Sequence, residues 1–217
     1  TNFCSFVGLH PVPIVHGMTI AEYALMINEE GWLKDEAKCD LHYILCENYD
    51  HNTFYKLPVK PSPNLPNMRS IYLYPSICFF EGTDISLGRG TDKQFQILGH
   101  PNLKNGDFSF TPTSKPGATN PPHKGVTCQG YDLTDLLETD LQKESKINLT
   151  WLLKIYKEFE NKEAFFLKTG HFNRLAGNDV LKQQIIDGKS EQEIRESWQE
   201  GLVKFREIRS RYLLYAE

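Results

Sequence analysis

The feature that most constrains the fold of this chain is a proline-rich segment, Lys56–Pro66, which contains four prolines in eleven residues. Proline lacks a backbone N–H and fixes φ, so neither a helix nor a central strand can run through such a segment. We therefore place a domain boundary near residue 50. It divides the 217 residues into a first part, residues 1–50, and a larger second domain, residues 51–217.

The first part has the pattern of a layered α/β domain. Thr19 and Glu22 form a T-x-x-E capping box, which predicts the start of a helix. The short apolar runs Ser5–Leu9 and Leu41–Cys46 read as strands, the second of them buried. The chain starts at Thr1, without Met or a signal peptide and within seven residues of a strand-like run, so we expect that a targeting segment or a whole domain precedes it.

The second domain is predicted to place strands before helices, as in an α+β fold. Arg69–Phe80 has the pattern of a helix bent at Pro75, and the glycine-rich stretch that follows reads as a loop or edge strand. Beyond it the polar residues Asn148 and Asn178 stand where they could cap helices of the last third. The predicted strands are Gln94–Leu98, Asp107–Thr111 and Lys124–Asp132.

Composition excludes several classes of protein. The net charge is −4, and no basic stripe of the kind that binds nucleic acid is present. The longest apolar run is too short to span a membrane. Five cysteines are scattered without a CxxC pair, so we expect no disulfide framework and no zinc site, and we interpret them as small buried residues. His10 and His16 are too far from other ligands in sequence to indicate a metal.

The stretch Phe80–Asp92 is the most informative for function. Glycines on both sides of Arg89 would let the backbone approach a ligand, and the guanidinium can bind a carboxylate or phosphate with two hydrogen bonds. Glu81 follows an apolar run, so partial burial could suit it to general acid catalysis. The alternative is a glycine-rich turn in which Arg89 pairs internally with Glu81, Asp84 or Asp92.

Two further residues are open to either a functional or a structural interpretation. His16 could project from the end of a strand, where α/β folds place their ligands, or simply bond to a backbone carbonyl at the turn. Asn64 lies between Pro63 and Leu65-Pro66, so its amide is held rigidly enough to grip a sugar, although asparagine is also an ordinary turn residue.

Three segments together resemble the NamZ family of exo-β-N-acetylmuramidases. They are Phe6–Thr19, Leu57–Pro66 and Tyr74–Thr91, and their order and approximate spacing match the family. The endings Phe172–Gly177 and Tyr212–Tyr215 resemble its C-terminus, so the resemblance covers nearly the whole chain.

The resemblance implies a glycoside hydrolase that releases terminal N-acetylmuramic acid from peptidoglycan fragments in the periplasm or outside the cell. It implies a Rossmann-like N-terminal domain, of which residues 1–50 would be the last helix and strand, and a smaller α+β C-terminal domain. The active site would lie in the cleft between the two domains, with a further catalytic carboxylate upstream of Thr1 and no cofactor or metal. Site residues expected in this chain are Glu81 as a catalytic group, with His16, Asn64, Thr83, Arg89 and Thr91 for substrate binding.

Two other classes of function remain open from the sequence. One is a non-catalytic glycan-binding module that grips sugar with Arg89 and Asn64. The other is a structural or assembly domain, which a flat surface around Arg89 would favour.

Overall fold

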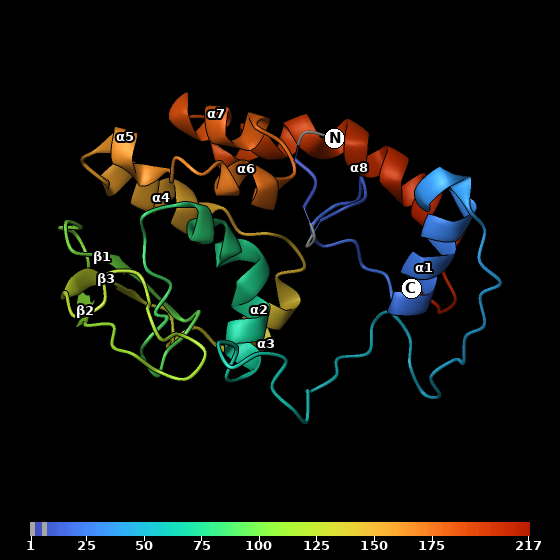
Figure 1. Ribbon diagram of the computed structural model, residues 1–217, viewed down its shortest axis with the longest axis horizontal. Coiled ribbons are helices and arrows are strands. Elements are labelled where there is room, and N and C mark those ends of the chain that lie inside the picture. The colour runs from blue at the N-terminus through green and yellow to red at the C-terminus, as the bar shows by residue number, and fades with distance from the viewer. Residues whose placement is uncertain (1–2, 6–7) are drawn as a thin grey trace. The chain divides into compact units, whose positions relative to one another are not determined.

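The computed structural model describes residues 3–5 and 8–217 and divides the chain into two compact units. One unit contains Leu9–Tyr55 and Gln192–Glu217, and the other contains the N-terminal residues to Gly8 together with Lys56–Glu191 (Figure 1). Among the described residues, helices long and apolar enough to cross a membrane are absent. The assignment of residues 1–50 to a Rossmann-like domain stays a prediction.

The unit formed by residues 9–55 and 192–217 is built from helices and extended loops. The predicted capping box is confirmed, because the Thr19 side chain accepts from the Glu22 N–H while the Glu22 carboxylate accepts from the Thr19 N–H. Within the helix that follows, Met26 is fully buried while Ile20 is 91% exposed. Its elements are α1 (Ile20–Glu29), the 3-10 turn η1 (Lys34–Glu36) and α8 (Glu191–Arg209).

Glu22 connects three segments of this unit. Its side chain is fully buried, and it accepts hydrogen bonds from the His51 ring, 2.9 Å away, and from the Leu214 N–H, 2.7 Å away. Burial opposes ionisation, but the hydrogen bonds from Thr19, Leu214 and His51 outweigh it and hold the pKa of Glu22 below its ordinary value. Glu22, the acidic member of the capping box, therefore also fixes the loop near His51 and the C-terminal segment.

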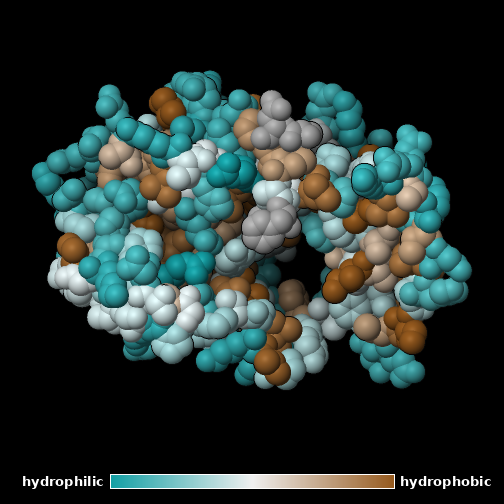
Figure 2. Space-filling model, viewed as in Figure 1, coloured by the Kyte–Doolittle hydropathy of each residue, from teal (hydrophilic) through white to brown (hydrophobic). Residues whose placement is uncertain are grey.

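The prediction of a buried strand at Leu41–Cys46 is wrong. The segment is irregular and mostly exposed, and Ile44 is 95% exposed. A strand needs a partner for its backbone groups, and residues 9–55 and 192–217 contain no other strand. The run lines a hollow of about 480 Å³ beside Ile20 and Tyr215, and hydrophobic residues are visible on the surface of this unit (Figure 2). The predicted strand Ser5–Leu9 includes residues 6 and 7, outside the described residues; Ser5 and Gly8 form an isolated bridge.

The unit containing residues 56–191 has a small antiparallel sheet and helices, which confirms the predicted mixture of α/β and α+β structure. The strand order is β1-β3-β2, with Gly99 of β1 opposite Gly130 of β3 (Figure 1). The strands are β1 (Ile97–His100), β2 (Phe108–Phe110) and β3 (Cys128–Asp132). The helices are α2 (Met68–Ile77), the 3-10 turn η2 (Cys78–Gly82), α3 (Glu138–Lys143), α4 (Thr150–Glu158), α5 (Lys162–Phe165), α6 (His171–Ala176) and α7 (Val180–Ile186).

The predicted helix around Pro75 forms as α2 and continues as η2. The Asn67 side chain accepts from the Ser70 N–H at its start. Pro75 has no N–H to donate to the preceding turn, and the chain passes into the tighter 3-10 turn three residues later. Upstream, Lys56–Pro66 is irregular as predicted.

The hydrophobic core beside η2 is built from aromatic rings. Phe79 lies 6.0 Å from Phe172 of α6, and Phe172 lies 4.8 Å from Phe166 between ring centroids. Gly82 permits this packing, because a Cβ at that position would lie only 2.5 Å from the backbone N of Phe172. The residues after Gly82 are thereby held against α6.

Candidate functional site

The loop Thr83–Asp92 leads directly out of this core and is fixed at two points. Thr83 forms a bridge with Phe166, and Ser86 forms a bridge with Gly99 of β1. Ile85, Ser86 and Leu87 are all buried, so this part of the loop packs into the unit. The sequence prediction of a loop here is confirmed, and the anchoring makes its polar side chains part of a fixed surface.

Arg89 of this loop pairs with Glu81 of η2, which immediately precedes the loop. One guanidinium nitrogen of Arg89 donates to the Glu81 carboxylate at 3.0 Å, and the side chains are 30% and 23% exposed. The Arg89 Cζ lies 4.9 Å from the centre of the Phe95 ring, which holds the guanidinium plane from one side. This is the only hydrogen bond of the Arg89 side chain in the described part of the chain, so further donors remain for a ligand.

The glycines that flank Arg89 serve the protein's own packing. Gly88 and Gly90 have φ of +73° and +80°, a region that favours glycine. A Cβ at Gly88 would lie 2.5 Å from the Ile97 side chain, and one at Gly90 would lie 2.5 Å from Pro121. They therefore shape the turn and let neighbouring segments approach, whereas the sequence had suggested room for a ligand.

Both threonines predicted to bind substrate make hydrogen bonds within the loop. The Thr83 hydroxyl donates to the Phe80 carbonyl at 2.8 Å, and the Thr91 hydroxyl donates to the Gly88 carbonyl at 2.7 Å. Each hydroxyl also accepts a backbone N–H, from Ile85 and Lys93 respectively. They hold the turn on either side of Arg89.

Asn64 fastens a second loop to the proline-rich segment. It is buried, and its amide nitrogen donates to the Gly117 carbonyl at 3.0 Å. Its side-chain oxygen is buried and has no hydrogen-bond partner in the described residues. The rigid amide expected from the flanking prolines is present, with one acceptor unused.

His16 belongs to the unit formed by residues 9–55 and 192–217. Its Nδ1 accepts from the Met18 N–H at 3.1 Å, and its ring stacks on Tyr23 with centroids 5.1 Å apart. Burial lowers the pKa of His16, and the positive charge of Arg209 lowers it further. Both effects favour the neutral ring, and His16 makes a turn contact as in the structural alternative, but with a backbone N–H in place of the expected carbonyl.

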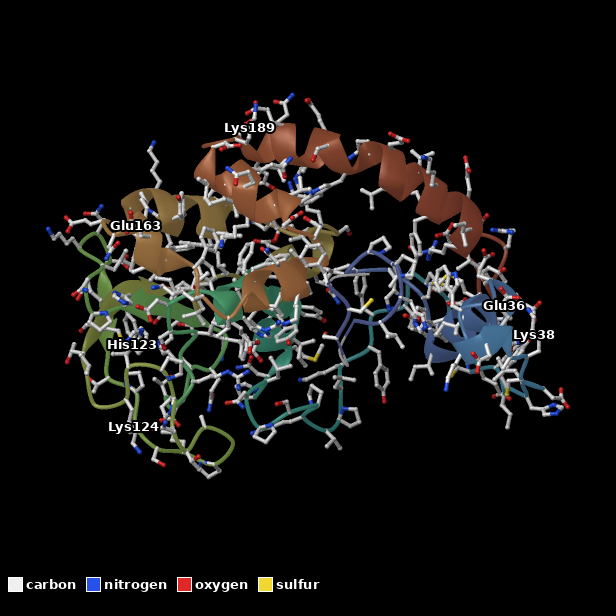
Figure 3. The ribbon with its side chains drawn as sticks, turned by 45° about the horizontal axis from the view of Figure 1, so that its top comes forward. Glu36, Lys38, His123, Lys124, Glu163 and Lys189 are labelled. Atoms are coloured by element: carbon white, nitrogen blue, oxygen red, sulfur yellow. The ribbon has the colours of Figure 1, made fainter. Side chains whose placement is uncertain are left out.

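A cluster that the sequence did not indicate lies at the same loop. Asp84 is 40% exposed at its side chain, and His100 Nε2 lies 3.1 Å from its Oδ2. His123 Nε2 lies 2.7 Å from the Asp84 backbone carbonyl. Figure 3 labels His123 on the loop that follows the proline-rich stretch after β2. His100 and His123 lie 16 and 39 positions after Asp84, and the Ser86–Gly99 bridge brings the first of them beside the loop.

Comparison with known families decides the affiliation of the chain. Residues 72–215 match the model "Exo-beta-N-acetylmuramidase NamZ, C-terminal", and residues 1–69 match the corresponding N-terminal model. The chain belongs to the NamZ family.

Relatives of this NamZ-family chain are known from sequence and from structure. The peptidoglycan β-N-acetylmuramidase NamZ of Bacillus subtilis (strain 168) is 34% identical over 99% of this chain, which covers 54% of that protein. A DUF1343 family protein from Bacteroides fragilis NCTC 9343 superposes with a TM-score of 0.94 at 47% identity, over 100% of this chain and 60% of that one. A second DUF1343 protein from this organism, at 17% identity and a TM-score of 0.80, shares the fold. The chain thus spans little more than half the length of these relatives.

In this NamZ-family chain the predicted site residues fall into two groups. Glu81, Thr83, Arg89 and Thr91 meet at one anchored loop, and Asn64 lies in the same unit. His16 lies in the other unit. The resemblance motif Tyr74–Thr91 pointed to the loop, whereas Asp84 was passed over because its histidine partners are distant in sequence.

Proposed function

We propose that this chain is part of a glycoside hydrolase that releases terminal N-acetylmuramic acid from peptidoglycan fragments. The family affiliation and the name of the Bacillus subtilis relative support this activity. Because the chain spans 54% of that relative, the remaining catalytic groups would come from sequence outside it. The loop from Glu81 to Thr91 would supply one wall of the active-site cleft, and the substrate would be a muropeptide or disaccharide.

The observation that carries the proposal is the partly buried Glu81–Arg89 pair on a fixed loop. N-acetylmuramic acid differs from N-acetylglucosamine only by a lactyl ether with a carboxylate, so discrimination between them needs a cationic partner. Arg89 is held by Phe95 and Glu81 but keeps unused donors, and a planar guanidinium fits a planar carboxylate. A bound lactyl carboxylate would share Arg89 with Glu81.

Glu81 is the residue of this loop that we propose as catalytic. Glycosidases place two carboxyl groups on either side of the scissile bond, one of them as the acid. Glu81 accepts from Arg89 through Oε2, so in the acid role Oε1 would carry the proton that Glu81 gives to the glycosidic oxygen. Thr83 and Thr91 would shape this wall, while contacts of Asn64 and His16 with the sugar stay predictions.

Hydrolysis by the full-length protein tests the proposal. Incubation with a chromogenic β-glycoside of N-acetylmuramic acid should release the chromophore, and Glu81→Gln should lower kcat by about 100- to 10,000-fold, the usual contribution of a general acid. Glu163→Gln on α5 makes the same change of charge at an exposed position of the same unit and should leave kcat unchanged (Figure 3). Absence of turnover with binding retained would favour a non-catalytic glycan-binding module, and absence of both would favour a structural domain.

A further inference from the structure

Asp84 is the one partly exposed side chain in a buried stretch of the loop. Thr83, Ile85 and Ser86 are each at most 5% exposed, whereas the Asp84 carboxylate is 40% exposed. Its Oδ2 faces His100, and its Oδ1 lies 3.6 Å from His123 Nε2. The fold thus places two largely buried imidazoles behind a single carboxylate that faces solvent.

The hydrogen bonds around His100 determine where its proton lies. The Asn102 N–H donates to His100 Nδ1 at 3.0 Å, so Nδ1 must present a lone pair. Burial lowers the pKa of His100, and although the hydrogen bond to Asp84 opposes this, the net direction is downward. The ring is therefore neutral with its proton on Nε2, and that N–H donates to Asp84.

His123 is fixed in the same way. Its Nε2 lies 2.7 Å from the Asp84 carbonyl oxygen, which can only accept, so this nitrogen also carries a proton. The rings of His100 and His123 meet edge to face at 4.7 Å, and His100 packs on Phe159 at 4.8 Å. Both imidazoles therefore direct an N–H toward Asp84, one to its side chain and one to its backbone.

This arrangement of protons argues against a metal. The ligand atoms of Asp84, His100 and His123 lie within 4.8 Å of one another, a spacing that invites a metal interpretation. A metal would need the lone pairs of both Nε2 atoms, but His100 Nδ1 already accepts an N–H, so its ring would have to become an imidazolate. Without a metal, both Nε2–H groups have acceptors on Asp84, the carboxylate for His100 and the backbone carbonyl for His123, and neither ring has to lose a second proton.

We propose that Asp84 is a substrate-binding carboxylate that accepts hydrogen bonds from hydroxyl groups of the sugar, with His100 as the residue that positions it. The inference rests on the proposed function, since the ligand is the same sugar that Arg89 would recognise. Asp84 lies on the same anchored loop as Glu81 and Arg89. Because Oδ2 is held by His100, Oδ1 is the atom left to face a ligand, and orienting it in advance lowers the entropic cost of binding.

The carboxylate of Asp84 and the guanidinium of Arg89 should affect sugar binding differently. The hydroxyl groups that Asp84 would bind occur in both N-acetylmuramic acid and N-acetylglucosamine. Asp84→Asn in the full-length protein should therefore weaken binding of both sugars by roughly tenfold, a loss typical of one charge-assisted hydrogen bond, and leave their affinity ratio unchanged. Asp107→Asn, an exposed aspartate of the same unit, is the matched control and should have no effect.

The outcomes separate this inference from the proposed function. If the wild-type protein binds neither sugar, the proposed function fails. If it binds N-acetylmuramic acid and Asp84→Asn binds it equally well, only the role of Asp84 is overturned. A change in the affinity ratio alone would mean that Asp84 senses the lactyl carboxylate, which also contradicts the proposal.

Two variants of His100 test its positioning role. His100→Phe keeps an aromatic ring to pack on Phe159 but loses the N–H donor, and it should weaken sugar binding, and so raise KM, as Asp84→Asn should. His100→Gln retains a donor and should recover part of the affinity; equal loss in both variants, or no loss in either, would overturn the role. Titration of the chain with Zn²⁺ should show no micromolar site, and a tight site that is lost in His100→Phe would establish the metal interpretation instead.

Discussion

The five cysteines differ sharply in environment. All five are free thiols, which confirms that they form no disulfide framework. Cys78 and Cys128 are buried, whereas Cys39 and Cys46 are exposed, so the expectation of small buried residues is wrong for the exposed pair. Exposure decides reactivity, because only an accessible thiolate attacks a reagent.

Thiol labelling of the native protein should therefore occur in two stages. Burial raises the pKa of the Cys78 thiol to about 12 and that of Cys128 to about 11, so neither should react near pH 8. We expect rapid reaction of Cys39 and Cys46 with a disulfide reagent, and reaction of Cys78 and Cys128 only after denaturation. Peptide mass mapping of the labelled sites checks this, and rapid labelling of Cys78 would contradict the packing of η2.

Residue-level prediction succeeded where a local motif carried the information. The sequence indicated the Arg89 loop and offered an internal ion pair as one alternative, and the structure contains the pair with Glu81. It could not indicate the partners of Asp84, because His100 and His123 are 16 and 39 positions away and meet it through tertiary contacts, such as the pairing of Ser86 with Gly99.

At the level of secondary structure, the contact between η2 and α6 depends on one glycine. A methyl group at Gly82 would press on the backbone of Phe172, which cannot move away as a flexible side chain could. Gly82→Ala should lower the free energy of unfolding by about 1–3 kcal/mol or more. Gly201→Ala in α8 has open space around it and should instead stabilise by about 0.5–1 kcal/mol, as helical alanine does. Chemical denaturation measures both, and an unchanged stability for Gly82→Ala would contradict the packing.

The cap of α1 should give stability a dependence on pH. The pKa of Glu22 lies lower in the folded than in the unfolded state, so its stabilisation is complete above the unfolded value and is lost as the pH falls through the folded one. We expect wild-type stability to decline below about pH 4.5, near the ordinary value for glutamate. Glu22→Gln should cost about 1–3 kcal/mol at pH 7 and flatten this decline. The exposed Glu36→Gln is the control, and a pH profile unaltered by Glu22→Gln would contradict the role of the carboxylate (Figure 3).

Elements with local signals were predictable from the sequence and those needing distant partners were not. The capping box of α1 and the prolines of Lys56–Pro66 act within a few residues, and both predictions are confirmed. Leu41–Cys46 has the composition of a strand, but a strand forms only beside another strand. Its exposed side chains show that apolar composition alone does not determine burial.

At the scale of the whole molecule, the chain should be a poor enzyme on its own. Glycoside hydrolysis uses two carboxyl groups, and we propose that one of them lies outside this chain. The isolated chain should therefore show little turnover of a chromogenic muramic acid glycoside at equal molar concentration to the full-length protein. Comparable turnover would refute the idea that this chain supplies only one wall of the cleft.

The central claim is that Arg89 lets this molecule recognise the carboxylate of N-acetylmuramic acid, and the affinity ratio for the two sugars tests it most directly. The partly buried ion pair with Glu81 contributes on the order of 1 kcal/mol, so Arg89→Met should leave folding nearly intact. Loss of a charge-assisted bond of about 1.5–3 kcal/mol should weaken binding of N-acetylmuramic acid roughly 10- to 150-fold.

Calorimetric titration with both sugars measures the ratio of their affinities. It is carried out on the full-length protein, its Arg89→Met variant and an Arg174→Met control. The account predicts that Arg89→Met loses the preference for N-acetylmuramic acid while binding N-acetylglucosamine as before, and that Arg174→Met changes neither. A variant that melts several degrees lower and keeps its preference would show that Arg89 only holds the loop and that the carboxylate is recognised elsewhere.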